Sequence, residues 1–306
     1  MTTSDMQQAS AVLVLLVCLV VGVVVTNVVI AVLWLARRDA VAAGVARPLF
    51  RSSWSLAHVW FGAQAMLAAI LALAMLAVAL LTLAPEFSLS QGLEGLDGPS
   101  VPPDAVWLLA VATLGQCVAM AAVPALVIRY GYGVRLADIG LTRRLERRHI
   151  ALGVALGLVM LLLGATMEFG LETVVRFTLG AEALHSVRSA SEMFSPVPFI
   201  KGAEGDLGAM AAILLAVAVG APVAEELFFR GWLQRCARER FGVLASVLIS
   251  AALFALAHGG PVLILAIFPM GLLLGWAYER TGSLWVVILM HAVNNGAATL
   301  GVWLFE

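Results

Sequence analysis

Residues 207–240 read LGAMAAILLAVAVGAPVAEELFFRGWLQRCARER, an apolar run that ends in the charged group Glu225-Glu226 and Arg230. A helix of about 20 apolar residues is long enough to cross the ~30 Å hydrocarbon core of a bilayer. An ionisable group inside such a helix costs at least ~2.5–3.5 kcal/mol, so the groups found there usually carry function. The stretch therefore predicts a membrane helix that ends in a candidate functional site.

The whole chain shares this apolar character. Of its 306 residues, 62% are apolar and 12% are charged, which is about half the ~25% charged fraction of a soluble domain. The mean hydropathy of +1.01 excludes a soluble globular protein. The formal net charge of -1 gives no indication of a nucleic-acid partner. Cys18, Cys117 and Cys236 lie far apart with no CxxC spacing, so neither a disulfide framework nor a cysteine-ligated metal is expected.

Seven further apolar runs are long enough to suggest membrane spans. They lie near 11–36, 57–84, 105–128, 150–170, 243–258, 262–278 and 284–304. The predicted fold class is an all-α, polytopic transmembrane bundle of about eight spans. We divide it into N-terminal helices (1–204, about four spans) and a C-terminal helical core (205–304). The pairs Gly153/Gly157 and Gly271/Gly275 have the small-xxx-small spacing that lets helices approach closely.

Arginine is concentrated in four of the predicted loops. Loops 37–51, 129–149, 229–241 and 279–283 contain 4, 6, 4 and 1 Arg. Because Lys and Arg collect in cytoplasmic loops, these four loops are predicted to share the cytoplasmic side and both termini to lie outside. The Ala/Val/Arg-rich composition and compact loops are typical of a multi-pass protein of the bacterial inner (cytoplasmic) membrane.

Helical spacing separates the two adjacent glutamates. Residues four apart share one face of a helix, so Glu226 and Arg230 are predicted to pair. By the same spacing His291 and Asn295 point the same way. Glu225 lies a helical step of ~100° from Glu226 and is left to face another partner.

Depth in the membrane brings Glu225 together with two histidines. If the helix continues to a turn at Phe241-Gly242, Glu225 and His258 both lie ~24 Å from that turn. His291 lies about 13 Å beyond the Gly282 turn. It lies at the same membrane depth as Glu225 and His258 if the 229–241 hairpin projects roughly 10 Å into the cytosol. The three side chains are therefore predicted to meet in one cavity near the cytoplasmic leaflet.

Three short motifs carry a resemblance to a known family. They are Glu225-Glu226-x-x-x-Arg230, Phe254-x-x-x-His258 and His291-x-x-x-Asn295. In this order they resemble the signature of the CPBP family of CAAX proteases and bacteriocin-processing enzymes, which includes the type II CAAX prenyl endopeptidases and abortive-infection proteins. The stretches YERTGSLW (278–285) and IGLT (139–142) are also similar to that family, and the resemblance covers residues 205–300 or so.

The resemblance implies an intramembrane endopeptidase that cleaves a membrane-associated protein or peptide. It implies that Glu225 activates a water that His258 helps to hold, and that His291 and Asn295 stabilise the oxyanion. Glu226 and Arg230 would brace the site, with Phe254 as a further supporting residue. The oligomeric state is not predicted.

Other interpretations stay open. Glu225, His258 and His291 would also form a two-His-one-carboxylate zinc site with an open position, although we favour a mechanism without a metal or other cofactor. A catalytically silent scaffold or receptor would use the same cavity for a peptide or lipid. A proton-coupled transporter would also place Glu and His at mid-depth, but the sequence shows no internal repeat.

Overall fold

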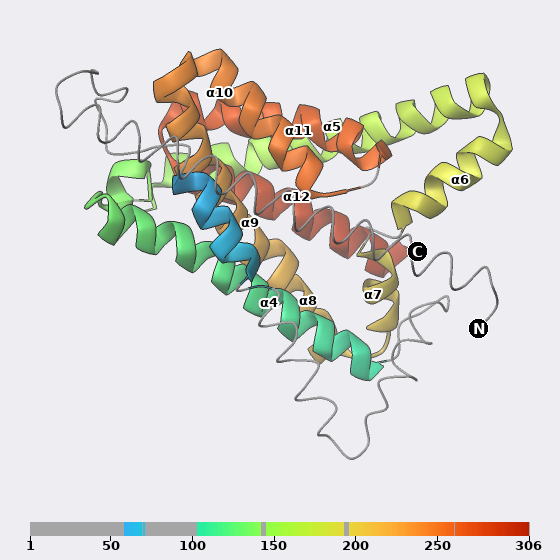
Figure 1. Cartoon of the computed structure of the whole chain (residues 1–306). Coiled ribbons are helices and arrows are strands. Elements are labelled where there is room, and N and C mark those ends of the chain that lie inside the picture. Colours follow the sequence, from blue (N-terminus) through green and yellow to red (C-terminus); the bar gives the residue numbers. More distant parts are fainter. Residues whose placement is uncertain are drawn as a thin grey trace, which may run out of the picture. The chain divides into compact units, whose positions relative to one another are not determined.

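The computed structural model describes residues 58–68, 70, 103–141, 145–192, 196–259 and 261–305. The chain divides into two compact units, Met1–Phe61 and Gly62–Glu306. Nearly all described residues belong to the second unit, and the fold below is that of this unit (Figure 1). The predicted span near 11–36 and most of the one near 57–84 lie outside the described residues.

Every regular element in the described part of the second unit is helical, which confirms the all-α fold class. The elements are α4 (Pro103–Leu126), η2 (Val127–Gly131), η3 (Leu136–Ile139), α5 (Arg147–Leu179), α6 (Ala181–Glu192), α7 (Val197–Gly202), α8 (Leu207–Leu214), η4 (Leu215–Gly220), α9 (Ala221–Glu226), η5 (Leu227–Gln234), α10 (Arg235–Ala257), α11 (Pro261–Thr281) and α12 (Leu284–Phe305). Three of the four η elements are π-helical, and η3 is a 3-10 helix.

Five helical stretches of the described chain are long and apolar enough to cross a membrane. They are Ala110–Gly131, Arg147–Leu179, Leu207–Ala257, Leu263–Thr281 and Leu284–Phe305. These stretches contain or largely overlap six of the predicted spans, because Leu207–Ala257 includes both 207–228 and 243–258. The chain is therefore a multi-pass membrane protein, and the count of about eight spans stays a prediction, as does the boundary near residue 204.

The long stretch Leu207–Ala257 is broken at one residue. Gly242 has φ 82° and ψ 177°, a backbone conformation outside the helical region that favours glycine because it has no Cβ. Beyond this break the Ser250 hydroxyl donates a hydrogen bond to the Phe229 carbonyl at 3.2 Å. The chain after Gly242 therefore packs back on the chain before it, which confirms the predicted turn at Phe241-Gly242.

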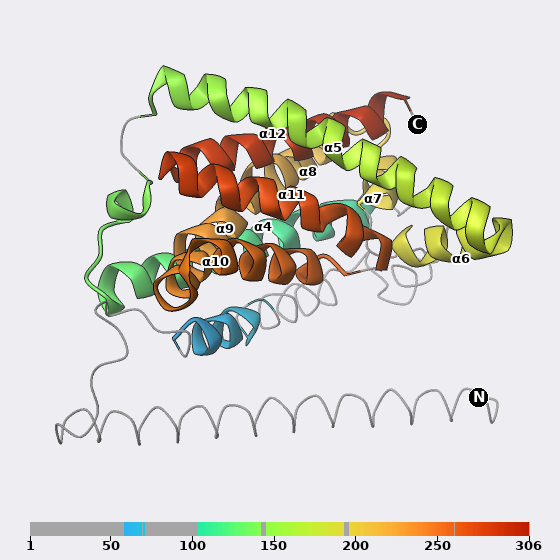
Figure 2. The same ribbon diagram turned by 90° about the horizontal axis from the view of Figure 1, so that it is seen from above.

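Helix α12 lies among the other helices of the bundle and places His291 in the protein interior. It contacts α5, α11 and α9, and Figure 2 shows it beside α5 and α11. The contact with α5 depends on two glycines: a Cβ added at Gly153 would lie 2.7 Å from Leu289 Cβ, and one at Gly157 would lie 2.7 Å from Val293 Cβ. The predicted close approach at this glycine pair is confirmed.

This packing predicts opposite effects for two alanine substitutions in α5. Gly157→Ala adds a methyl group where α12 leaves no room, and overpacking of this kind costs about 1–3 kcal/mol of unfolding free energy. Gly170→Ala is the matched control, because nothing lies within 4 Å of a Cβ at that position. It should leave stability unchanged or raise it, since alanine has the higher helix propensity. Thermal unfolding in detergent measures both, and an equal effect would contradict the packing of α5 on α12.

Candidate active site

The two adjacent glutamates end α9, a short α-helical turn between two π-helical segments. The segment η4 precedes α9 and η5 follows it. A π-helical turn contains more residues than an α-helical turn, and such turns occur frequently at functional sites. They change the direction in which successive side chains point, so the local backbone helps to aim Glu225 and Glu226.

Side chains from three neighbouring helices hold these π-helical segments. The bonds run from Asn295 Nδ2 of α12 to Val217 O at 3.1 Å, from Ser250 Oγ of α10 to Phe229 O at 3.2 Å, and from Cys117 Sγ of α4 to Ala216 O at 3.8 Å. Neither Ser250 nor Cys117 was predicted to be a site residue. The sequence feature that could have identified them is a polar side chain within an otherwise apolar run.

Glu226 is completely buried and binds two partners through one oxygen. Its Oε1 accepts a hydrogen bond from Arg230 Nη1 at 2.9 Å and lies 2.8 Å from His291 Nδ1. Arg230 is also completely buried, and its guanidinium lies over the Phe254 ring at 4.4 Å while Nη2 donates to Gly271 O at 3.2 Å. The predicted pairing of Glu226 with Arg230 is confirmed, and the contact with His291 was not predicted.

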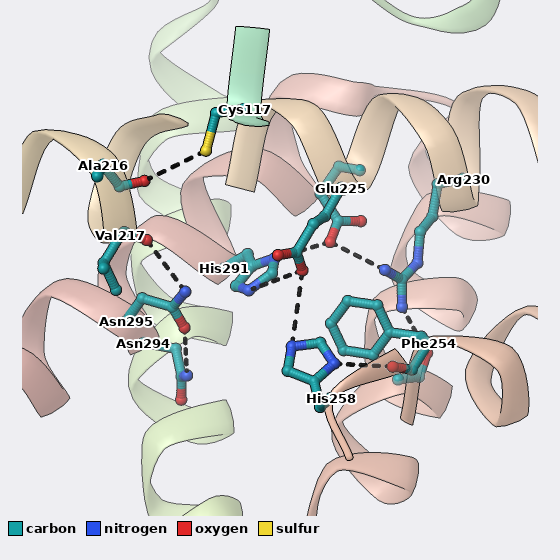
Figure 3. Close-up of polar contacts among 12 residues, drawn as sticks. Cys117, Ala216, Val217, Glu225, Arg230, Phe254, His258, His291, Asn294 and Asn295 are labelled. Atoms are coloured by element: carbon teal, nitrogen blue, oxygen red, sulfur yellow. Dashed lines mark hydrogen bonds and ion pairs between the residues drawn. The ribbon is translucent and has the colours of Figure 1, made fainter. Parts of the chain in front are cut away.

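Glu225 faces both His258 and His291, as Figure 3 shows. Its Oε2 lies 3.7 Å from His258 Nε2 and 3.9 Å from His291 Nε2. The side chains of Glu225 and His258 are 18% and 31% exposed, whereas that of His291 is 3% exposed. The structure thus brings together the three side chains that the depth argument predicted to meet.

The hydrogen-bond partners of the His258 and His291 rings determine which ring nitrogen carries the proton and which one presents a lone pair to Glu225. His291 Nδ1 faces the Glu226 carboxylate, and His258 Nδ1 lies 2.8 Å from Phe254 O. Ionised carboxylate and carbonyl oxygens only accept hydrogen bonds, so we assign the proton of each neutral ring to Nδ1. Both Nε2 lone pairs then converge on the Glu225 carboxylate. Three converging acceptors suit a bridging water molecule, a shared proton or a metal ion.

Asn295 lies one helical turn after His291, and its hydrogen bonds extend along α12 and to η4. Besides the bond to Val217, its Oδ1 accepts from Asn294 Nδ2 at 3.1 Å. A side-chain amide has two N–H donors, and the bond to Val217 uses one of them. Its predicted part in oxyanion stabilisation therefore depends on the second N–H.

The donor atoms around Glu225 are of the types that bind zinc. Within the described chain, however, no group of three or more His, Cys, Asp or Glu side chains is placed to hold a metal ion. With zinc–ligand bonds of about 2.1 Å, tetrahedral ligands lie roughly 3.4 Å apart, which is shorter than the 3.7 and 3.9 Å seen here. A zinc ion would require Glu225, His258 and His291 to move closer together, and the metal-free interpretation stays a prediction.

Comparison with known families agrees with this geometry. Residues 207–297 match the family described as type II CAAX prenyl endopeptidase Rce1-like, and this range contains all three motifs. The resemblance to the CPBP family is thereby confirmed for this part of the chain, and it implies an intramembrane protease of the CAAX type. No similar protein was found among curated proteins or among solved structures.

The two glutamates are predicted to differ in their effect on stability. Glu226→Gln removes the charged partner of a buried arginine, a change that typically costs about 3–5 kcal/mol. Glu225→Gln is the matched control, because it makes the same chemical change one residue away at a side chain without a cationic hydrogen-bond partner in the structure. Thermal unfolding in detergent should show a clearly lower melting temperature for Glu226→Gln and no such change for Glu225→Gln. A larger loss of stability for Glu225→Gln would show that Arg230 pairs with Glu225 instead of Glu226.

Proposed function

From the family match over residues 207–297, we propose that this chain is an intramembrane endopeptidase that hydrolyses a peptide bond of a membrane-associated protein or peptide. The observation that carries the proposal is the position of Glu225 Oε2, which faces Nε2 of both His258 and His291. A carboxylate in this setting can take a proton from a water molecule that the ring nitrogens help to orient. No cofactor and no nucleic-acid partner enters the proposal.

In the proposed reaction Glu225 is the general base. A water lies between Glu225 and His258, and its oxygen attacks the substrate carbonyl carbon as its proton passes to Glu225. The tetrahedral intermediate then collapses, the carbon–nitrogen bond breaks, and Glu225 returns the proton to the departing amine. General acid–base catalysis of this kind contributes about 10²–10⁴-fold to a rate.

His291 is the proposed donor to the oxyanion. Its Nδ1–H is bound to the Glu226 carboxylate. For this role the neutral ring described above must first gain a second proton, on Nε2, which makes it an imidazolium beside a buried negative charge. With that proton, the charges of Glu225, Glu226, Arg230 and His291 sum to zero. The Nε2–H then donates to the negative oxygen of the intermediate, with the second N–H of Asn295 as the other proposed donor.

We propose that the site faces the cytoplasmic leaflet of a bacterial inner membrane and that both termini lie outside. Three arginines support this orientation, namely Arg235, Arg238 and Arg240, which lie in the first part of α10, before the break at Gly242. Because Lys and Arg collect on the cytoplasmic side of membrane proteins, this end of the helical hairpin belongs in the cytosol.

Glu225→Gln tests the proposed reaction directly. The amide keeps the shape and hydrogen bonding of the side chain but removes the base, so cleavage should fall by about 10²–10⁴-fold. Folding and detergent stability should stay close to those of the parent. The substrate is sought by comparing the proteomes of a Glu225→Gln strain and its parent, and purified protein then provides the rates. Unchanged processing of every membrane protein and peptide in that comparison would contradict the proposal and favour the scaffold.

Chelation tests the alternative that zinc participates. If bound at Glu225, His258 and His291, zinc would supply a Lewis acid that activates the attacking water. Under the favoured mechanism an extensively chelated sample keeps its activity, and elemental analysis finds far less than one zinc per chain. Activity that chelation removes and zinc alone restores would overturn the metal-free mechanism.

A further inference from the structure

The loop between α4 and α5 is hydrogen-bonded to three helices of the bundle. Three successive backbone carbonyls of this loop each accept one bond from a different helix. They are Asp138 O from Arg235 Nη1 of α10 at 2.8 Å, Ile139 O from Tyr278 OH of α11 at 2.9 Å, and Gly140 O from Leu284 N of α12 at 3.1 Å. Because α12 carries His291 and α10 leads to His258, the loop connects the helices that position both histidines.

Internal contacts fix the conformation of this loop. Arg135 binds Asp138 through two side-chain hydrogen bonds of 2.8 and 3.1 Å, which close the 3-10 turn η3. At the other end Gly140 has φ 90° and lies so close to Gly282 that an added Cβ would clash with the Gly282 carbonyl. A ligand bound to this loop would therefore act on a segment that is hydrogen-bonded to three helices.

The same loop lines a cavity of about 550 Å³. Its lining residues are Arg129, Arg135, Leu136, Ala137 and Leu141. Arg129 lies in η2, in the last turn of the candidate span Ala110–Gly131. The cavity therefore lies beside the end of a candidate membrane span, where we expect lipid headgroups.

We propose that this cavity binds the headgroup of an anionic phospholipid. Guanidinium groups bind phosphate through parallel N–H donors, and the remaining lining is apolar, as the glycerol and first acyl carbons require. Asp138 neutralises Arg135. Arg129 lies 5.7 Å from the centre of the Tyr130 ring and makes no salt bridge with another described residue, so it is the main attraction for a phosphate.

A headgroup in this cavity contacts the loop that holds α10, α11 and α12 together. Because a ligand that binds only the folded state stabilises it, an anionic lipid should raise the melting temperature of the protein. This site goes beyond the proposed protease activity and does not depend on it, since the binding test needs no peptide substrate.

The test is thermal unfolding of the full chain in a neutral detergent with added short-chain phosphatidylglycerol. We expect a saturable rise in melting temperature that short-chain phosphatidylcholine does not produce. Arg129→Gln should weaken the apparent affinity about tenfold, the effect of losing about 1.4 kcal/mol. Arg148→Gln is the matched control, because Arg148 is 76% exposed, pairs with Glu146 and does not line the cavity. It removes the same charge and should keep the parent affinity.

A second variant tests the cavity without changing its charge. Ala137 is an exposed residue of the lining, so Ala137→Trp should fold, fill the space and abolish the response to phosphatidylglycerol. Equal weakening by Arg129→Gln and Arg148→Gln would overturn the proposal, because it would show attraction to the general surface charge. The same rise with glycerol phosphate would show a site for free anions instead of lipids. The absence of any rise in the parent would also overturn it.

Discussion

The candidate site depends on one buried carboxylate that holds two cationic or proton-donating groups. Glu226 Oε1 binds both Arg230 and His291 with no exposure to solvent. A buried ion pair is stable only when good geometry and further hydrogen bonds offset the cost of desolvation. Arg230 gains a hydrogen bond to the Gly271 carbonyl and a contact with the Phe254 ring. Its Nε and Glu226 Oε2 are buried without a hydrogen-bond partner among the described residues. The pair ties α9 to three other helices, α10, α11 and α12.

Because of this arrangement, the two adjacent glutamates have different partners. With Glu226 committed to Arg230 and to Nδ1 of His291, the remaining nitrogen of that ring is directed at Glu225. The Phe254 carbonyl binds Nδ1 of His258 and so directs Nε2 of that ring towards Glu225 as well. Glu225 is therefore the carboxylate that we propose for proton transfer. The π-helical segments on both sides of α9 set the directions of these side chains.

Helical periodicity and depth were enough to predict much of the site. Spacing of four residues predicted the Glu226–Arg230 pair, and equal distances from Gly242 predicted that Glu225 and His258 would meet. The π-helical segments could not be predicted, because a change from i+4 to i+5 bonding has no residue signature. The bond from Asn295 to Val217 was missed for that reason, since it depends on a carbonyl in such a segment. The three loop carbonyls also escaped prediction because a backbone acceptor can occur at any residue.

Arg230 is paired with Glu226, and no described arginine makes a salt bridge with Glu225. The most direct measurement is a pair of double-mutant cycles on unfolding free energy, combining Arg230→Met with Glu226→Gln and, separately, with Glu225→Gln. We expect a coupling energy within the roughly 0.5–3 kcal/mol range of contacting residues for the Glu226 cycle. The coupling in the Glu225 cycle should be clearly smaller, because Glu225 acts on Arg230 through electrostatics without a hydrogen bond. A larger coupling between Arg230 and Glu225 would contradict this pairing.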